Sequence, residues 1–297
     1  MRICSVIFEL EVLTPMFMYG ADQSEPEVRP SAIKGMIRYW WRILQPDTDI
    51  NELHRREQKI FGGVWFGKVR NKIARPTASP LTIRVTQQRF LTGKYPFVPG
   101  AKGGKGKPHP TIWPTTRFDL NLQIDGLSSE EVKKIEAVVR LTFLLGSFGR
   151  RARRGFGSVQ ERNFTPETAD EVAQHVHELL GALGLHTQVQ GRVVRVLDTA
   201  SKRYNRPVLL RVTVCSQYDA WQKLVGKVRE ASHDFNINGC LGTANPRFAS
   251  PVWVSVVRLS NGSFVPVVSE LAFASKGGSP RRNLSLQSQF VKAICGQ

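Results

Sequence analysis

Residues 128–157 read SSEEVKKIEAVVRLTFLLGSFGRRARRGFG, a predicted helix followed directly by a basic, glycine-rich loop. Ser128 and Glu131 have the spacing of a capping box, which predicts that the helix begins after Ser128. Apolar residues then recur at helical spacing, and Gly146 is expected to end the helix. The loop therefore leaves a firmly anchored helix, and it runs into a short predicted strand.

The loop at residues 146–157 combines three residue types that suit single-stranded nucleic acid. Glycine lets a backbone approach a ligand closely, arginine offers planar charged forks to phosphate oxygens, and phenylalanine offers a flat face to a base. No acidic residue within the loop neutralises its arginines. A flexible, solvated basic loop is the alternative interpretation. The RNA-binding interpretation predicts contacts from Phe148, Arg150, Arg151, Arg153, Arg154 and Phe156.

Residues 29–44 predict an amphipathic helix whose first turn contains Pro30. Its apolar stripe should face the core. Large aromatic side chains on such a stripe are more often buried than exposed, so the two tryptophans are predicted to be core residues rather than platforms for bases. The stripe consists of Ile33, Ile37, Trp40, Trp41 and Leu44.

One face of the same helix is strongly basic. Lys34, Arg38 and Arg42 recur every four residues, so their like charges repel one another, and no acidic residue within the helix offsets them. An external anion would relieve the repulsion, whereas an ordinary solvated basic face is the alternative. These three residues and Arg29 are predicted RNA contacts.

The charge balance also indicates a polyanionic partner. The chain has 297 residues, enough for two ordinary domains, with 42 Lys+Arg against 24 Asp+Glu and a net charge of +18. An anionic membrane is the competing partner, but no basic amphipathic helix, lipidation signal or membrane-length apolar run is present. The sequence therefore predicts a cytoplasmic RNA-binding protein that does not associate with membranes.

The sequence predicts no metal and no cofactor. The four cysteines are widely scattered without a C-x-x-C pair, so free thiols in a reducing compartment are expected: Cys4, Cys215, Cys240 and Cys295. The lysine- and glycine-rich stretch at residues 92–116 faintly resembles a phosphate-binding P-loop, but the required spacing is missing and prolines oppose the helix that should follow. We expect a mobile basic loop there, with no nucleotide or other small-molecule substrate.

The predicted elements indicate an α+β protein. The first half runs strand, helix, strand, strand, helix, strand, which is the order of a ferredoxin-like or RRM-like fold. Two helices on one face of an antiparallel sheet would leave the other face, or the loops, for RNA. The second half contains the same element types, including a hairpin around Asn261-Gly262 and a final helix at residues 283–294.

Three motifs carry a family resemblance. The first runs from Thr14-Pro15 and Gly20-Ala-Asp22 to residues 33–42, IKGMIRYWWR; the second is the glycine-rich loop; the third is RFASP at residues 247–251. In this order they resemble the first-subunit family of the Cmr complex, the type III-B CRISPR effector, within the RAMP superfamily.

The resemblance implies two ferredoxin-like domains, placed here at residues 1–163 and 164–297. It implies a non-catalytic role in antiviral defence, with guide RNA, target RNA and other Cmr subunits as partners. Arg247, in the third motif, is a further predicted RNA contact.

Two alternative functions stay open at the level of sequence. In a related RAMP backbone subunit, an aspartate in the corresponding loop cuts target RNA with a divalent metal, so Asp22, with Glu25, could serve a metal-dependent endoribonuclease. The first-subunit family is not regarded as the nuclease, and no histidine lies nearby for metal-free cleavage. A generic basic RNA-binding protein is the second alternative.

Overall fold

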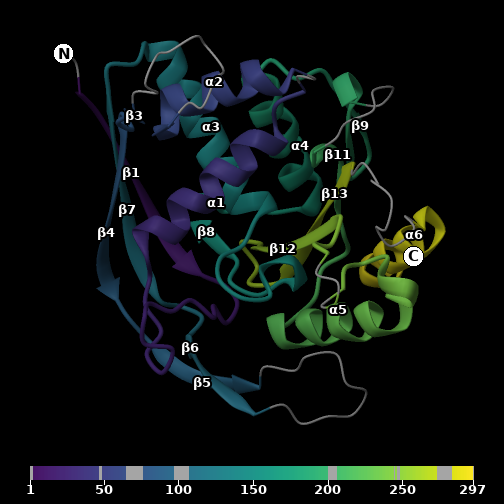
Figure 1. Cartoon of the computed structure of the whole chain (residues 1–297). Coiled ribbons are helices and arrows are strands. Elements are labelled where there is room, and N and C mark those ends of the chain that lie inside the picture. The colour runs from purple at the N-terminus through teal and green to yellow at the C-terminus, as the bar shows by residue number, and fades with distance from the viewer. Residues whose placement is uncertain are drawn as a thin grey trace.

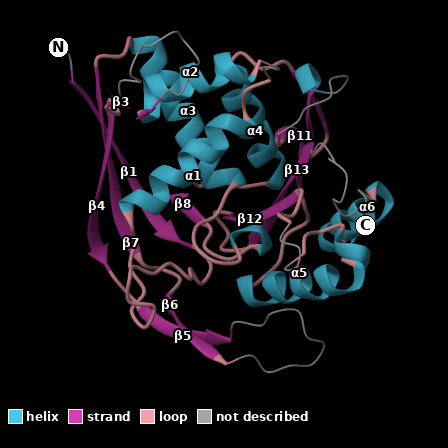
Figure 2. Cartoon of the chain, viewed as in Figure 1, coloured by secondary structure: helices cyan, strands magenta, loops and turns pink. Residues whose placement is uncertain are grey.

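The chain forms four layers: a sheet, a layer of helices, a second sheet and a second layer of helices (Figure 1). This computed structural model describes residues 3–46, 49–64, 76–96, 107–199, 206–243, 245, 248–272 and 283–296. Figure 2 shows the first sheet at the left, helices in the middle, and the second sheet to their right.

The first sheet is ferredoxin-like, as predicted. Its strand order is β4 (Leu81–Arg89), β7 (Arg117–Asp125), β1 (Ile3–Val12) and β8 (Val159–Glu161), and every neighbouring pair is antiparallel. Helix α1 (Pro30–Ile43) follows β1, and α3 (Ser129–Leu145) follows β7. Buried and partly buried residues alternate along β7, so one face of the sheet is turned toward the helices and the other is more open.

The first half also carries three insertions. Helix α2 (Ile50–Phe61) and the short pair β2 (Gly63–Val64) and β3 (Pro76–Thr77) follow α1. A hairpin of β5 (Thr92–Pro96) and β6 (Pro108–Ile112) lies in the stretch expected to be a loop, so that prediction was wrong for these strands. Rings from the hairpin region pack against the second half, as in the contacts of Tyr95 and Trp113 with Trp221, and such distant contacts leave no pattern in the local sequence. The lysine- and glycine-rich residues 97–106 lie outside the described residues.

The second sheet has the order β12 (Val252–Arg258), β13 (Phe264–Ala272), β11 (Val208–Val214), β10 (Val193–Val196) and β9 (Thr187–Gln190). With α5 (Trp221–Phe235) and α6 (Leu284–Cys295), the run β11-α5-β12-β13-α6 is ferredoxin-like. Strand β10 pairs with β11 as β8 pairs with β1, although β10 comes before β11 in the chain. In the second half, the fourth strand of the ferredoxin-like sheet is therefore β10, which comes before the other three strands in the chain. The remaining elements are α4 (Ala169–Ala182) and the 3₁₀ turns η1 (Ala152–Arg154), η2 (Leu197–Thr199) and η3 (Ile237–Gly239).

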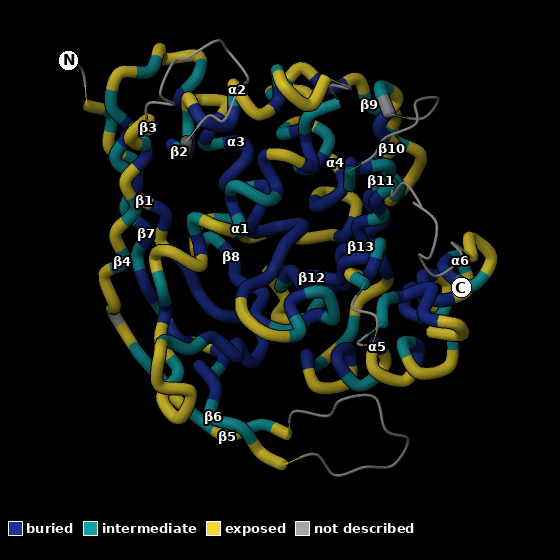
Figure 3. The backbone as a smooth tube through the Cα atoms, in the orientation of Figure 1, coloured by how far each residue is buried: buried dark blue, intermediate teal, exposed yellow. Residues whose placement is uncertain are grey.

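One hydrophobic core joins the two halves. Helices α1, α3 and α4 lie between the sheets, and a single cluster of buried residues runs from β1 through these helices to β11 and β13 (Figure 3). A second cluster lies between the second sheet and α5 and α6. The division at residue 163 stays a prediction, since packing continues across it.

The expected local features of α1 and α3 are present. Both hydrogen bonds of the capping box between Ser128 and Glu131 form. Trp40 and Trp41 are buried, as predicted. Gly146 ends α3 with an extended backbone rather than a left-handed one, and a Cβ there would overlap the Trp40 indole. Glycine is needed at that position because Trp40 packs so closely.

The prediction of four free cysteines was wrong for one pair. Cys215, just after β11, and Cys295, at the end of α6, form a disulfide, with their Cα atoms 4.4 Å apart. They are 80 residues apart in sequence, so only the fold shows that they are neighbours. Cys4 and Cys240 are free. No helix in the described part of the chain is long and apolar enough to cross a membrane.

Candidate nucleic-acid interface

Backbone hydrogen bonds, within the loop and to Pro15, fix the conformation of the glycine-rich loop. The Phe148 N–H donates to the Gly157 carbonyl at 2.8 Å, and the Gly157 N–H donates to Pro15 at 3.0 Å. Gly157 has a φ of +72°, and a Cβ there would overlap the Phe148 carbonyl. The Phe148 side chain is 2% exposed, so it is a core residue and offers no ring face to a base in this conformation.

The next part of the loop attaches to the edge of the second sheet. The Gly155 N–H donates to the Val254 carbonyl of β12 at 2.8 Å. The Arg154 guanidinium donates to Leu241 O at 2.6 Å and to Val252 O at 3.3 Å. Burial, together with the nearby charges of Arg151 and Arg153, lowers the pKa of Arg154 to about 10. Arg154 thus acts inside the protein, where it donates to a carbonyl just after η3 and to one at the start of β12.

Arg153 also joins the two halves, although it lies nearer the surface. Its guanidinium lies 4.7 Å from the centre of the Trp253 ring and donates to Ser250 O at 2.9 Å. It also donates to the Tyr39 hydroxyl of α1 at 3.1 Å. Burial lowers the pKa of Arg153. One half-buried arginine therefore connects the loop, α1 and the second sheet.

The other arginines of the loop lie nearer to solvent. Arg150 is exposed, packs over the Tyr19 ring at 5.2 Å and donates to the Gln23 side chain at 2.6 Å. Arg151 is half-buried in the left-handed region, with a φ of +62°. Phe156 is half-buried against the rings of Phe17 and Tyr95.

Arg29 lies near these loop arginines, at the start of α1. It donates to the Tyr19 carbonyl at 3.2 Å and pairs with Glu27 at 3.1 Å. Tyr19 therefore contacts both Arg29 and Arg150, and it brings these two predicted RNA contacts together.

The basic face of α1, which has no acidic residue within its own helix, has an acidic partner on α2. The buried Glu57 carboxylate of α2 accepts from both Arg38 and Arg42. Burial alone would raise the pKa of Glu57, but the hydrogen bonds and charges of the two arginines lower it overall. Lys34 donates to Ser79 and to the Leu81 carbonyl, and burial lowers its pKa.

Glu57 could have been found in the sequence. It follows Leu53 by four residues and precedes Phe61 by four, so it lies on the buried stripe of α2. An acidic residue on an apolar stripe indicates a basic partner on the neighbouring element, because a buried carboxylate needs one.

An exposed strip of α1, centred on Gly35, lies between arginines on two sides. Arg38 and Arg42 flank it on the α2 side, and Arg153, which donates to the Tyr39 hydroxyl, lies on the other side. Gly35 is exposed between them, and a Cβ there would meet no atom within 4 Å. Of the predicted contacts, Arg38, Arg42 and Arg153 therefore flank this strip. Phe148 and Arg154 point into the protein, and Lys34 is bonded to Ser79 and Leu81. Arg247 lies outside the described residues.

The loop that holds Asp22 is exposed, and the Asp22 carboxylate accepts from the Ser24 N–H at 2.7 Å. That hydrogen bond lowers the pKa of Asp22. Within the described ranges, no three His, Cys, Asp or Glu side chains gather as metal ligands.

The family model that describes the RAMP superfamily matches residues 9–160, which hold the first sheet, its helices and the glycine-rich loop. The chain therefore belongs to the RAMP superfamily. More particularly, it is 30% identical over 185 residues to the CRISPR system Cmr subunit Cmr1-2 of Pyrococcus furiosus, a match that covers 52% of this chain and 93% of that protein. It is 28% identical over 210 residues to Cmr1-1 of the same organism, a match that covers 66% of this chain and 57% of that protein.

Solved structures with a similar fold agree over the full length. The crystal structure of apo Cmr1 from Pyrococcus furiosus matches with a TM-score of 0.63 at 18% identity, over 100% of this chain and 97% of that one. A chain of the type III-B Cmr-beta complex bound to cognate target RNA matches with a TM-score of 0.58 at 11% identity, over 99% of this chain and 100% of that one. These matches support two ferredoxin-like domains.

Proposed function

We propose that this chain is a non-catalytic RNA-binding subunit of a type III-B CRISPR effector complex. It would act in the cytoplasm in antiviral defence, with guide RNA, target RNA and other Cmr subunits as partners. The relatives named as Cmr subunits and the similar chain in an RNA-bound complex support this role. The observation that supports this role most directly is the exposed strip of α1. Arg38 and Arg42 lie along one side of it, Arg153 lies along the other, and nothing covers Gly35 in the middle.

The proposed mode of binding is contact with the sugar-phosphate backbone. Arg38 and Arg42 are oriented by Glu57, and Arg153 by Tyr39 and Trp253, so little side-chain entropy is lost when they bind. Their remaining N–H groups match phosphate oxygens. No aromatic face stands free on the strip, so sequence preference should be weak, and affinity should fall steeply as salt rises.

The direct test is RNA affinity, measured by fluorescence anisotropy with a labelled guide-length RNA. Arg42→Gln and Arg150→Gln should each weaken binding roughly tenfold, as loss of a charge-assisted hydrogen bond does. Arg192→Gln, which removes an exposed arginine of the second half, is the matched control. An equal loss in all three variants, or in none, would show that RNA does not bind at Arg42 and Arg150.

The non-catalytic part of the proposal has its own test. The protein is incubated with target RNA and Mg²⁺, and the products are compared with those of Asp22→Ala. We expect uncut RNA in both cases. Specific cuts that disappear in Asp22→Ala would establish the metal-dependent endoribonuclease instead.

A further inference from the structure

Two arginines of α1 share one oxygen of a single carboxylate. Arg38 Nε and Arg42 Nη2 both donate to Oε1 of Glu57. Two nitrogens that are bonded to one oxygen lie within about 6 Å of each other, so the two guanidinium groups are close neighbours. The three side chains together carry one net positive charge, because two cations face one anion.

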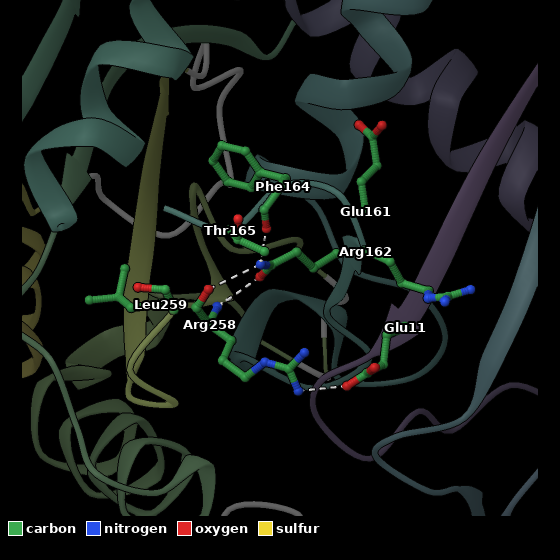
Figure 4. A pocket seen from close by; sticks show the side chains of 9 residues that line it. Glu11, Glu161, Arg162, Phe164, Thr165, Arg258 and Leu259 are labelled. Atoms are coloured by element: carbon green, nitrogen blue, oxygen red, sulfur yellow. Dashed lines mark hydrogen bonds and ion pairs between the residues drawn. The ribbon is translucent and has the colours of Figure 1, made fainter. Parts of the chain in front are cut away.

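Glu11 holds two arginines in a different arrangement. Its side chain is 5% exposed and that of Glu57 is 3% exposed, so the two carboxylates are similarly buried. Arg258 donates to Oε1 of Glu11, on the wall of the pocket drawn in Figure 4, whereas Arg117 donates to Oε2. These two arginines belong to β12 and β7, so Glu11 connects distant strands. Glu57 instead brings together two side chains that lie one turn apart on one helix.

Helix α2 fixes the position of Glu57. Leu53 and Phe61, one turn to either side of Glu57, are buried in the hydrophobic core. Lys59 of the same helix pairs with Glu131, in the first turn of α3, at 2.7 Å. A buried carboxylate without its cations would be an unpaired charge, which is strongly unfavourable. The two arginines therefore stay on Glu57 when a ligand binds, and the ligand must use their other N–H groups.

Those other N–H groups are accessible. Among the residues that the structure describes, Glu57 is the only acceptor for the guanidinium groups of Arg38 and Arg42, whose side chains are 33% and 44% exposed. Lys34, the third cation of this face, differs because Ser79 and the Leu81 carbonyl accept from it. A phosphate group has enough oxygens to accept from two guanidinium groups at once. Each backbone phosphate has one negative charge, which matches the net charge of the three side chains.

We propose that Arg38 and Arg42 form a single site for one backbone phosphate of RNA, and that Glu57 is the residue that positions them. The inference rests on the proposed function, since it takes RNA to be the ligand. It assigns to an acidic residue the role of strengthening the binding of a polyanion. Removal of a negative charge alone favours RNA binding, so the sign of the Glu57 effect separates positioning from net charge.

The first test is a double-mutant cycle in RNA affinity, measured by fluorescence anisotropy with a labelled single-stranded RNA at several salt concentrations. Arg38→Gln and Arg42→Gln should each weaken binding roughly tenfold, and the double variant should bind about as weakly as either single one, because the phosphate site needs both cations. The slope of log affinity against log salt should fall by about 0.7, the value for one phosphate of a single strand. Arg38→Gln with Arg150→Gln is the control pair, because Arg150 lies over Tyr19 instead. Its losses should multiply to roughly a hundredfold.

The second test removes the carboxylate. Glu57→Gln should weaken binding about fivefold although it raises the net charge, and it should have no effect in a chain that already carries both arginine substitutions. Glu52→Gln is the matched control, since it makes the same change on the same helix at an exposed residue that pairs with Arg55. It should leave binding unchanged or slightly tighter. Thermal melts check that each variant is folded, and the triple variant, which has no unpaired carboxylate, gives the salt slope if the double variant is unfolded.

Each outcome has a definite meaning. Losses that multiply for Arg38→Gln and Arg42→Gln, with a slope change of about 1.4, would show two separate phosphate contacts and overturn the inference. Glu57→Gln that binds as tightly as Glu52→Gln, or arginine variants that bind like the parent, would overturn it too. If Glu57→Gln does not fold, the cycle between the two arginines decides alone. In all these cases, weak binding by Arg150→Gln leaves the proposed function intact, whereas a parent protein that binds no RNA overturns the proposed function as well.

Discussion

The arginines at the two ends of the glycine-rich loop differ in role, and their surroundings decide how. Arg154 donates to the backbone carbonyls of Leu241, just after η3, and Val252, at the edge of the second sheet, whereas Arg150, four residues earlier in the same loop, is exposed. Both belong to one glycine-rich motif. One part of the motif therefore connects the two halves of the protein, and another part is a candidate RNA contact.

This difference predicts a separation of stability from binding. Arg154→Ala leaves the Leu241 carbonyl without its Arg154 donor, whereas the Val252 carbonyl keeps the Ser250 hydroxyl, so the free energy of unfolding should fall by about 2 kcal/mol, the cost of one such unsatisfied group. Arg150→Ala should change it by less than about 0.5 kcal/mol, as exposed substitutions usually do, but should weaken RNA binding. Urea denaturation and anisotropy measure the two quantities. A large loss of stability in Arg150→Ala with none in Arg154→Ala would reverse the assignment.

Glu131 makes the stability of the protein depend on pH in the acid range. The hydrogen bonds of Glu131 with Lys59 and Ser128 lower its pKa from 4.5 to about 2. Because the folded-state pKa lies below the unfolded one, this stabilisation is present above pH 4.5 and is lost as pH falls from 4.5 toward 2. Glu131 is partly exposed, so its contribution is about 1 kcal/mol after screening by solvent. Glu131→Gln should lower stability at pH 7 and flatten its pH dependence in that range. An unchanged acid limb in chemical denaturation would contradict this.

At the scale of elements, α1 shows how a helix can be built for a close approach. Glycine in a helix interior costs about 0.5–1 kcal/mol relative to alanine. No atom of the described structure lies within 4 Å of the place where a Cβ at Gly35 would stand, so packing within the protein does not require glycine at this position. A ligand backbone that crosses α1 at this point would explain the glycine.

Substitution of Gly35 tests that explanation. Gly35→Ala should raise the free energy of unfolding by about 0.5–1 kcal/mol. Gly35→Leu should leave the fold intact but weaken RNA binding roughly tenfold, as loss of close phosphate contacts would. Gly226→Leu in α5 is the matched control, because a Cβ at Gly226 also meets no atom within 4 Å. Equal RNA affinity in the two leucine variants would mean that RNA does not cross α1.

At the scale of the whole molecule, the two ferredoxin-like halves share one core. Arg153 and Arg154 donate to Ser250 O and Leu241 O of the second half, Arg206 donates to the Arg42 carbonyl of α1 at 2.7 Å, and Arg258 donates to Glu11. Helix α4 follows the predicted division at residue 163, yet it packs against α3, which precedes it. The halves are therefore coupled by packing and by arginines alike.

This coupling predicts a single unfolding transition. Near-ultraviolet circular dichroism and intrinsic fluorescence should give coincident urea curves, because exposing one half removes the packing partner of the other. Arg258→Ala, which removes one connection between the halves, should move the midpoint without splitting the curve. Two resolved transitions would show independent domains at residues 1–163 and 164–297.

The sequence by itself determined what depends on neighbours within about four residues. The capping box at Ser128, the apolar stripes of the helices, the hairpin at residues 252–272 and the order of elements in the first sheet follow from such short-range patterns. The tertiary structure alone decided which charges stay free. Arg154 meets Leu241 over 87 residues, Arg42 meets Glu57 on another helix, and Cys215 meets Cys295 over 80 residues. An arginine has the same charge and shape wherever it stands in the chain. Only the long-range contacts that it makes in the fold determine how many of its N–H groups are used within the protein and how many remain for RNA.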